Sequence, residues 1–148
     1  MEAVIFVGVQ GSGKSSYYKE RFFRTHVRIN LDMLRSRHRE RLLLRACLEA
    51  KQPFVVDNTN PRAADRARYV QPARAAGFRV VGYYFQAALG EALARNAARP
   101  PDEHVPARGV AGTYRALEPP TPAEGFDALY HVTLVAGGFA VQEWRDAV

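Results

Sequence analysis

The residues best suited to chemistry form one short segment near the start of the chain. Residues 8–15 read GVQGSGKS and satisfy the phosphate-binding pattern G-x-x-x-x-G-K-[ST] at every required position. Gly8, Gly11 and Gly13 allow backbone angles that other residues avoid, so that successive N–H groups can turn inward around a phosphate. We expect nucleotide contacts from Gly8, Gly11, Ser12, Gly13, Lys14, Ser15 and Ser16.

Lys14 and Ser15 have distinct chemical roles in such a loop. The Lys14 ammonium group is expected to reach the outer phosphates, and the Ser15 hydroxyl to coordinate Mg²⁺. A glycine-rich turn with an incidental lysine is the alternative. The apolar residues 3–7 read as a buried strand that leads into the loop, and residues 16–24 read as the helix that leaves it. This context favours a site for a nucleoside triphosphate with Mg²⁺.

Strand and helix patterns alternate over the first 99 residues, and a parallel sheet follows from that alternation. The patterns predict strands over 3–7, 26–31, 54–56 and 78–85, and helices over 16–24, 33–51, 61–76 and 88–99. Further along we expect a loop over 102–108, a helix over 110–118 and a hairpin of strands over 130–135 and 139–144. The predicted class is α/β, with a parallel sheet of the P-loop NTPase type that helices cover on both faces.

Two carboxylates follow predicted strands at the edge where parallel sheets bind their ligands. Asp32 comes after the strand over 26–31, and Asp57 comes after the strand over 54–56. Asp32 is a candidate general base for an attacking hydroxyl. Asp57 is a candidate ligand of Mg²⁺, or a hydrogen-bond partner of its ligands. For either residue, capping of the following helix is the alternative.

Three arginines are placed to meet phosphate charge. Arg35 lies three residues after Asp32, so one helical turn would put both side chains on the same face. Arg95 and Arg99 are spaced i, i+4 at the end of a predicted helix. We expect both on a helical lid over residues 88–108, where they supply positive charge to the transferred phosphate. The alternative is an exposed helix end whose arginines lie near the negative end of the helix dipole.

Composition indicates one domain over residues 1–148 with a surface suited to a polyanion. The net charge is +6, and residues 21–45 and 62–79 carry +6 and +4, whereas residues 100–148 carry −4. A solvated helix face is the alternative source of this clustering. The single cysteine, Cys47, excludes an internal disulfide, and the chain lacks an apolar run of about 18 residues. We therefore expect a cytoplasmic protein with no membrane span.

Several segments outside the loop resemble the kinase domain of the 5′-polynucleotide kinases. The resemblance is to the domain of animal polynucleotide kinase-phosphatase in particular, and to the bacteriophage polynucleotide kinase. It runs from about residue 5 to about residue 126. The matching segments are DNTNP (57–61), ARYVQ (67–71), ARAAG (73–77), HVP (104–106) and PTPAEGF (120–126).

The resemblance implies transfer of the terminal phosphate of ATP, with Mg²⁺, to the 5′-hydroxyl end of DNA or RNA in repair or end processing. It implies that Asp32 is the general base, that Arg35 contacts a phosphate of the acceptor, and that Arg95 and Arg99 are lid arginines. Leu31 stands where many members have arginine, so one contact with the acceptor is missing. The Asp-x-Asp-Gly-Thr signature of the phosphatase partner is absent from the chain.

Two other functions stay open at this point. A P-loop kinase of a small-molecule acceptor is the first alternative, although a small acceptor needs no extended basic surface such as residues 21–45. A binding module gated by ATP is the second, and the combination of Asp32 with two lid arginines disfavours it. The oligomeric state does not follow from the sequence.

Overall fold

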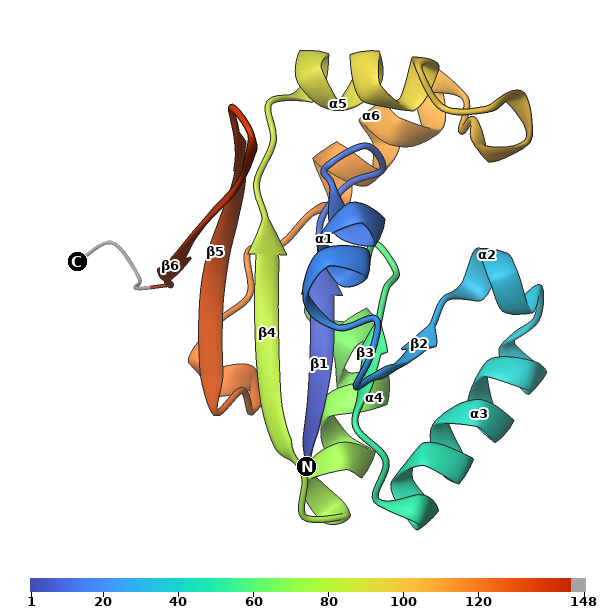
Figure 1. Cartoon of the computed structure of the whole chain (residues 1–148), viewed down its shortest axis with the longest axis vertical. Helices are drawn as coiled ribbons and strands as arrows, with labels where there is room; N and C mark the ends of the chain where they lie inside the picture. The colour runs from blue at the N-terminus through green and yellow to red at the C-terminus, as the bar shows by residue number, and fades with distance from the viewer. Residues whose placement is uncertain (145–148) are drawn as a thin grey trace.

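The computed structural model of the protein describes residues 1–144 and has an α/β fold (Figure 1). Within these residues one sheet has six strands in the order β2-β3-β1-β4-β5-β6. The first five run parallel, and β6 pairs antiparallel with β5. The strands are β1 (Glu2–Val7), β2 (Val27–Ile29), β3 (Phe54–Val56), β4 (Arg79–Phe85), β5 (Ala128–Val135) and β6 (Gly138–Glu143). Residues 145–148 of the predicted domain lie outside the described residues.

Helices cover both faces of the sheet, as predicted. The α-helices are α1 (Lys14–Arg21), α2 (Leu31–Leu34), α3 (Arg37–Ala50), α4 (Ala63–Ala75), α5 (Leu89–Ala97) and α6 (Ala107–Ala116), and the 3-10 helices are η1 (Pro101–Glu103) and η2 (Pro122–Glu124). Helix α1 packs on one face, and α3 and α4 pack on the other. Helices α5 and α6 lie at the carboxyl end of the sheet (Figure 1). In the part of the chain that the structure describes, no helix has the length and hydropathy that crossing a membrane requires.

The central strand β1 is buried on both sides, which explains its continuous apolar sequence. Ala3 and Ile5 belong to the core beneath α3 and α4, whereas Val4 and Phe6 belong to the core beneath α1. All four side chains are fully buried. Because the loop that follows β1 is anchored by this strand, burial of the strand places the phosphate-binding residues at the carboxyl edge.

The single helix predicted over 33–51 is wrong, because the segment forms two helices, α2 and α3. Arg35 adopts a left-handed backbone conformation with a φ of 72°, which ends α2. Ser36 then begins α3 as its N-cap, because its Oγ accepts a hydrogen bond from the Arg39 backbone N–H. Serine is among the preferred N-cap residues, so Ser36 was a visible signal for a helix start.

The start of α2 also corrects the predicted end of the second strand. Strand β2 ends at Ile29, and Asp32 lies within the first turn of α2 instead of directly after a strand. Asn30 is the N-cap of this helix, and its Oδ1 accepts a hydrogen bond from the Met33 backbone N–H at 2.9 Å. Asp32 is therefore not the cap of its helix.

The remaining elements agree with the prediction to within a few residues. The helix predicted over 61–76 is α4, and Gly77 follows it with a φ of 82°. The predicted hairpin is β5 and β6. The segment over 102–108 is not entirely a loop, because η1 reaches into it and α6 begins at Ala107.

Candidate functional site

The phosphate loop, residues 8–15, joins β1 to α1 at the carboxyl edge of the sheet. Gly11 and Gly13 adopt left-handed conformations, with φ of 80° and 98°, as predicted for residues that turn their N–H groups inward. Gly8 does not, and its predicted conformational role is wrong. A Cβ atom at Gly8 would lie 2.9 Å from the Cβ of Phe85, so glycine is needed there for close packing against β4.

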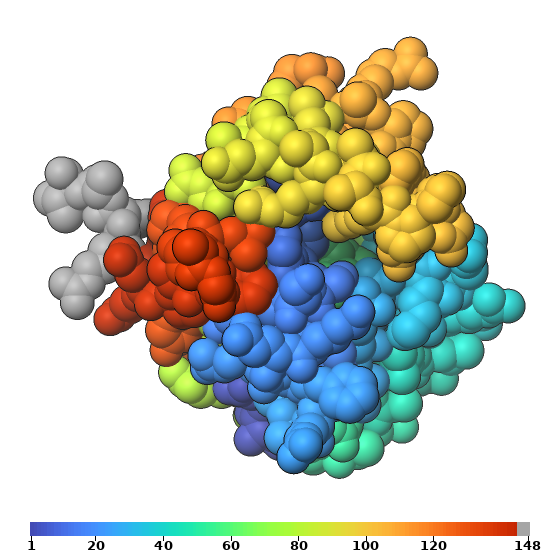
Figure 2. All heavy atoms as spheres, turned by 45° about the horizontal axis from the view of Figure 1, so that its top comes forward, coloured from blue at the N-terminus to red at the C-terminus, as the bar shows by residue number. Residues whose placement is uncertain are grey.

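Helix α5 lies directly against the phosphate loop. A Cβ atom at Gly11 would lie 2.3 Å from the carbonyl oxygen of Ala92 in this helix. From the same helix, Arg95 points its Nη1 at the Gly11 carbonyl oxygen at 3.4 Å. The surface of α5 and of the segment after it, yellow to orange in Figure 2, borders the blue surface of α1. The predicted lid segment therefore adjoins the loop, and Arg95 contacts it.

Lys14 is folded back onto its own loop. Its side chain is buried, and Nζ donates hydrogen bonds to the carbonyl oxygens of Gly8 at 2.9 Å and Val9 at 2.8 Å. An ammonium group at the N-terminus of α1, within a glycine-rich loop, suits a bound polyphosphate.

Three of the predicted site residues influence the pKa of a fourth, Lys14. Burial lowers the pKa of Lys14 to about 8. The Asp57 carboxylate favours the charged form of the lysine and acts in the opposite direction, but its effect is smaller. Arg99 lowers the same pKa further, and Asp32 raises it. The charges of the predicted base, of the predicted metal ligand and of one predicted lid arginine therefore all influence the pKa of the same lysine.

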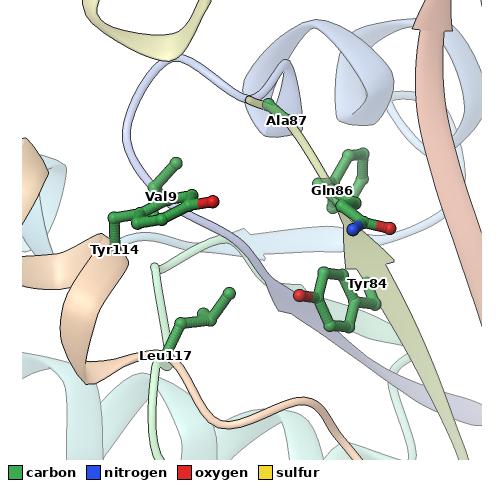
Figure 3. A pocket seen from close by; sticks show the side chains of 7 residues that line it. Val9, Tyr84, Gln86, Ala87, Tyr114 and Leu117 are labelled. Carbon is green, nitrogen blue, oxygen red and sulfur yellow. The ribbon is translucent and has the colours of Figure 1, made fainter. Parts of the chain in front are cut away.

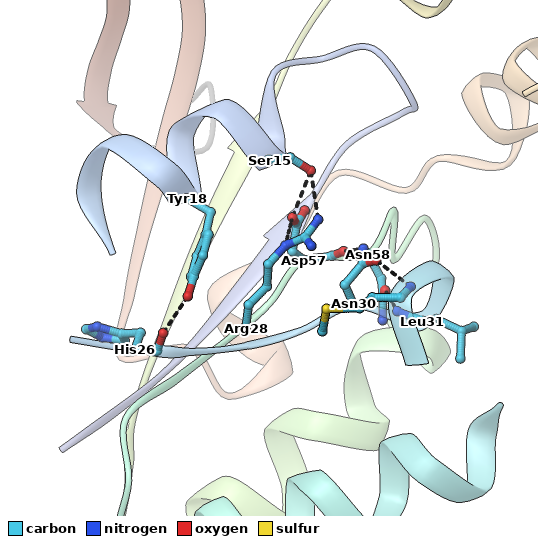
Figure 4. Close-up of polar contacts among 9 residues, drawn as sticks. Ser15, Tyr18, His26, Arg28, Asn30, Leu31, Asp57 and Asn58 are labelled. Atoms are coloured by element: carbon cyan, nitrogen blue, oxygen red, sulfur yellow. Dashed lines mark hydrogen bonds and ion pairs between the residues drawn. The ribbon is translucent and has the colours of Figure 1, made fainter. Parts of the chain in front are cut away.

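Ser15 and Asp57 form a pair that fits a magnesium ion. The Ser15 Oγ donates a hydrogen bond to Asp57 Oδ2 at 2.9 Å (Figure 4). The Asp57 residue is only 2% exposed. Asp57 does not cap the next helix, because the N-cap of α4 is Arg62. Within residues 1–144 no group of three or more His, Cys, Asp or Glu is arranged to hold a metal. Mg²⁺ needs only one or two protein oxygens beside phosphates and water, so the pair is sufficient.

Arg28 is a site residue that sequence reasoning missed. Its Nε donates to Asp57 Oδ2 at 2.9 Å, and its Nη2 donates to Ser15 Oγ at 3.1 Å. In Figure 4 the three side chains point toward one another. The alternation of Arg28 with the buried Ile29 along β2 was the available signal, but it does not reveal which strand lies next to β2.

Two asparagines fasten α2 to the end of β3. Asn30 Nδ2 donates to the Asp57 carbonyl oxygen at 2.6 Å, and Asn58 Oδ1 accepts from the Leu31 backbone N–H at 2.9 Å. Asn58 in turn donates to the buried carboxylate of Glu40 at 3.1 Å. Helix α2 has four residues and none of them is buried, so these hydrogen bonds hold it at the site.

The acceptor side of the site consists of Asp32 and Arg35. Asp32 is exposed on α2. Arg35 is also exposed, but the chain has left the helix there, so the predicted helical i, i+3 relation to Asp32 is not formed. Both carboxylates and the loop lie at one edge of the sheet.

Of the predicted nucleotide contacts, Ser12 is buried and Ser16 is exposed on α1.

Comparison with known proteins decides the family. A model of the AAA domain family matches residues 4–120, which is most of the chain and includes all the candidate site residues described above. The chain belongs to this family.

Two solved structures have the same fold as this AAA domain. The crystal structure of Chaetomium thermophilum Kti12, in complex with ADP-AlF3, is 16% identical and covers 88% of each chain with a TM-score of 0.66. The gluconokinase from Sinorhizobium meliloti 1021 is 20% identical, covers 89% of this chain and 82% of its own, and has a TM-score of 0.57. The fold is therefore of the P-loop NTPase type. The finer resemblance to polynucleotide kinases stays a prediction.

Two cavities open near the phosphate loop of this AAA domain. One, of about 200 Å³, lies between the end of β4 and α6 and is lined by Tyr84 and Tyr114 (Figure 3). It contains none of the predicted site residues. The other, of about 480 Å³, is lined by Arg95 of α5 and by Leu134 of β5. We assign the second cavity to the site, because Arg95 also contacts the loop.

The lowered pKa of Lys14 predicts that ATP binding takes up a proton in mildly alkaline solution. In the free protein the ammonium group loses its proton as the pH rises through about 8. A bound triphosphate favours the charged form and so raises this pKa. We expect proton uptake at about pH 8.5 and an ATP affinity that falls as the pH rises further.

Calorimetric titration of ATP at about pH 8.5, in two buffers of different ionisation enthalpy, measures this uptake. The observed heats should differ between the buffers for the natural protein. The same heat in both buffers would contradict the prediction.

Proposed function

We propose that this AAA domain is a P-loop kinase that transfers the γ-phosphate of ATP to a hydroxyl group of an acceptor. The observation that carries the proposal is the hydrogen bond of 2.9 Å between Ser15 Oγ and Asp57 Oδ2, next to the buried Lys14 of the phosphate loop. Phosphoryl transfer needs an acceptor in line, a group that takes its proton and cations around the transferred phosphate. The site holds a candidate for each role.

The nucleotide would bind along the loop. Lys14 and the backbone N–H groups of the loop would hold its phosphates, and Ser15 with Asp57 would hold Mg²⁺. When bound, the metal ion supplies positive charge to the phosphate oxygens. The cavity of about 480 Å³ beside Arg95 has the size of a small-molecule site and would take the nucleoside.

Asp32 would act as the general base. The acceptor oxygen forms a bond to the γ-phosphorus while the bond from that phosphorus to the bridging oxygen breaks, and ADP leaves. The acceptor proton passes to the Asp32 carboxylate, which is exposed and free to receive it. Arg95 and Arg99 would stabilise the charge on the transferred group, and Arg35 would bind the acceptor.

A small molecule with a hydroxyl group is the acceptor class that the comparisons favour. The fold is shared with a gluconokinase, whose name states a small acceptor.

A nucleic acid with a 5′-hydroxyl end is the second candidate, and a different observation favours it. Seven of the eight arginines in residues 21–45 are exposed. They surround Asp32 in the sequence, and exposed positive charge of this kind suits a phosphate backbone.

Salt dependence of acceptor binding separates the two candidates. Each phosphate contact on a single strand lowers log K by about 0.7 for every tenfold rise in salt concentration. For a polynucleotide acceptor we expect the KM of a 5′-hydroxyl oligonucleotide to rise steeply between low and high salt, for DNA and RNA oligonucleotides of matched sequence. Phosphorylation of a hydroxylated small molecule with a KM that hardly changes with salt would support the first candidate. The absence of label in acceptors of both classes would contradict the proposed function.

A further inference from the structure

The Arg28 side chain contacts both of the residues that fit Mg²⁺. Its guanidinium group bonds to Asp57 Oδ2 at 2.9 Å and to Ser15 Oγ at 3.1 Å. We propose that Arg28 competes with Mg²⁺ for Ser15 and Asp57, and thereby sets the Mg²⁺ concentration that the protein needs to bind ATP. The inference rests on the proposed function, in which these two residues hold the metal.

The burial of Asp57 explains why the guanidinium group of Arg28 lies beside its carboxylate. The Asp57 side chain is 1% exposed, and a buried carboxylate is costly without a positive partner. Arg28 is the ion-pair partner of Asp57, and its side chain is 27% exposed. The guanidinium carbon also lies 5.9 Å from the centre of the Tyr18 ring. Arg28 is thus built into the site from one side and open to solvent on the other.

Mg²⁺ would use the same oxygens. The ion binds oxygen at about 2.0–2.1 Å and demands a nearly octahedral arrangement of ligands. With guanidinium nitrogens 2.9 and 3.1 Å from the two oxygens, the ion would meet a positive group in its coordination sphere. The two cations repel each other, so binding of one disfavours the other.

The fold allows Arg28 to leave without moving the site. Its backbone is fixed, because β2 pairs with β3 and Arg28 lies opposite Val55. The side chain is long, partly exposed and can rotate toward solvent. Asp57 and Ser15 are held by β3 and α1, so they stay in place when the guanidinium group moves.

The test measures binding of a fluorescent, non-hydrolysable ATP analogue at increasing Mg²⁺ concentration, without any acceptor. We expect Arg28→Met to lower the Mg²⁺ concentration at half-maximal binding by about 3- to 10-fold. This change corresponds to a natural protein in which Arg28 leaves the two oxygens free for Mg²⁺ about 10–30% of the time. Arg115→Met removes an exposed arginine of α6 and is the matched control, with no change expected. An unchanged or increased Mg²⁺ requirement in Arg28→Met would overturn the inference.

Arg28→Gln keeps hydrogen-bond donors for Asp57 but carries no charge, and it serves where the methionine variant fails to fold. It should lower the Mg²⁺ requirement in the same direction, and failure to do so would equally overturn the inference. The natural protein separates this result from the proposed function. If the natural protein binds the analogue without any dependence on Mg²⁺, the proposed function fails; if it depends on Mg²⁺ and the variants do not differ, only the inference fails.

Discussion

Asp32→Ala is expected to lower kcat for phosphoryl transfer by about 10²- to 10⁴-fold, the usual contribution of a positioned general base. The Kd for ATP should change by less than about twofold, because Asp32 acts on the acceptor and lies on α2, outside the phosphate loop. Steady-state transfer from labelled ATP gives kcat, and titration calorimetry gives the Kd.

Glu20→Ala is the control for the Asp32 variant, since it removes an exposed carboxylate from α1. It should leave both quantities unchanged. Full transfer activity in Asp32→Ala would remove Asp32 from the mechanism and leave the acceptor proton to solvent.

Glu124→Ala is expected to destabilise the fold by about 3–5 kcal/mol, because it removes the carboxylate partner of a buried arginine. Arg66 is fully buried, and its guanidinium group meets Glu124 through two contacts, Nε to Oε1 at 2.7 Å and Nη2 to Oε2 at 3.0 Å. The Arg66 Nη1 also donates to the Asn60 carbonyl oxygen at 2.9 Å. Urea unfolding at 25 °C, followed by circular dichroism, measures the loss.

Glu49→Ala provides a matched comparison for that stability effect. Glu49 pairs with Arg45 at 3.9 Å, but both side chains are largely exposed. Exposed pairs of this kind contribute about 0–1 kcal/mol. A loss of similar size in both variants would show that burial of Arg66 does not govern the energetics.

The Arg66 pair shows where reasoning from charge alone fails. The arginines of residues 62–79 predict a basic surface, and most of them are exposed, but Arg66 is directed into the core. Its partner Glu124 is 58 residues away in the sequence. A contact of that length depends on how η2 returns to α4, which local patterns do not reveal.

The phosphate loop was predictable because its chemistry constrains consecutive residues. Gly11, Gly13 and Lys14 lie where the pattern requires, and the buried β1 before them carries its own apolar signal. Asp57 was predictable as a metal candidate because carboxyl ends of parallel strands share one edge. The structure brings it within hydrogen-bond distance of Ser15.

Arg28 was not predictable, because its role depends on strand order. In the sheet, β3 lies between β2, which carries Arg28, and β1, which leads into the loop with Ser15, so Asp57 at the end of β3 contacts both residues. The break at Arg35 was missed for a different reason. The apolar residues of 33–51 recur with helical spacing, and that periodicity outweighed the cap signal of Ser36.

Transfer of label from γ-labelled ATP is the measurement that tests the kinase assignment most directly. The protein is incubated with Mg²⁺ and with each acceptor class, namely hydroxylated small molecules and 5′-hydroxyl DNA and RNA oligonucleotides. We predict that label moves to one acceptor hydroxyl in the natural protein and not in Asp32→Ala. ATP binding without transfer to any acceptor, or equal transfer by both proteins, would contradict the account.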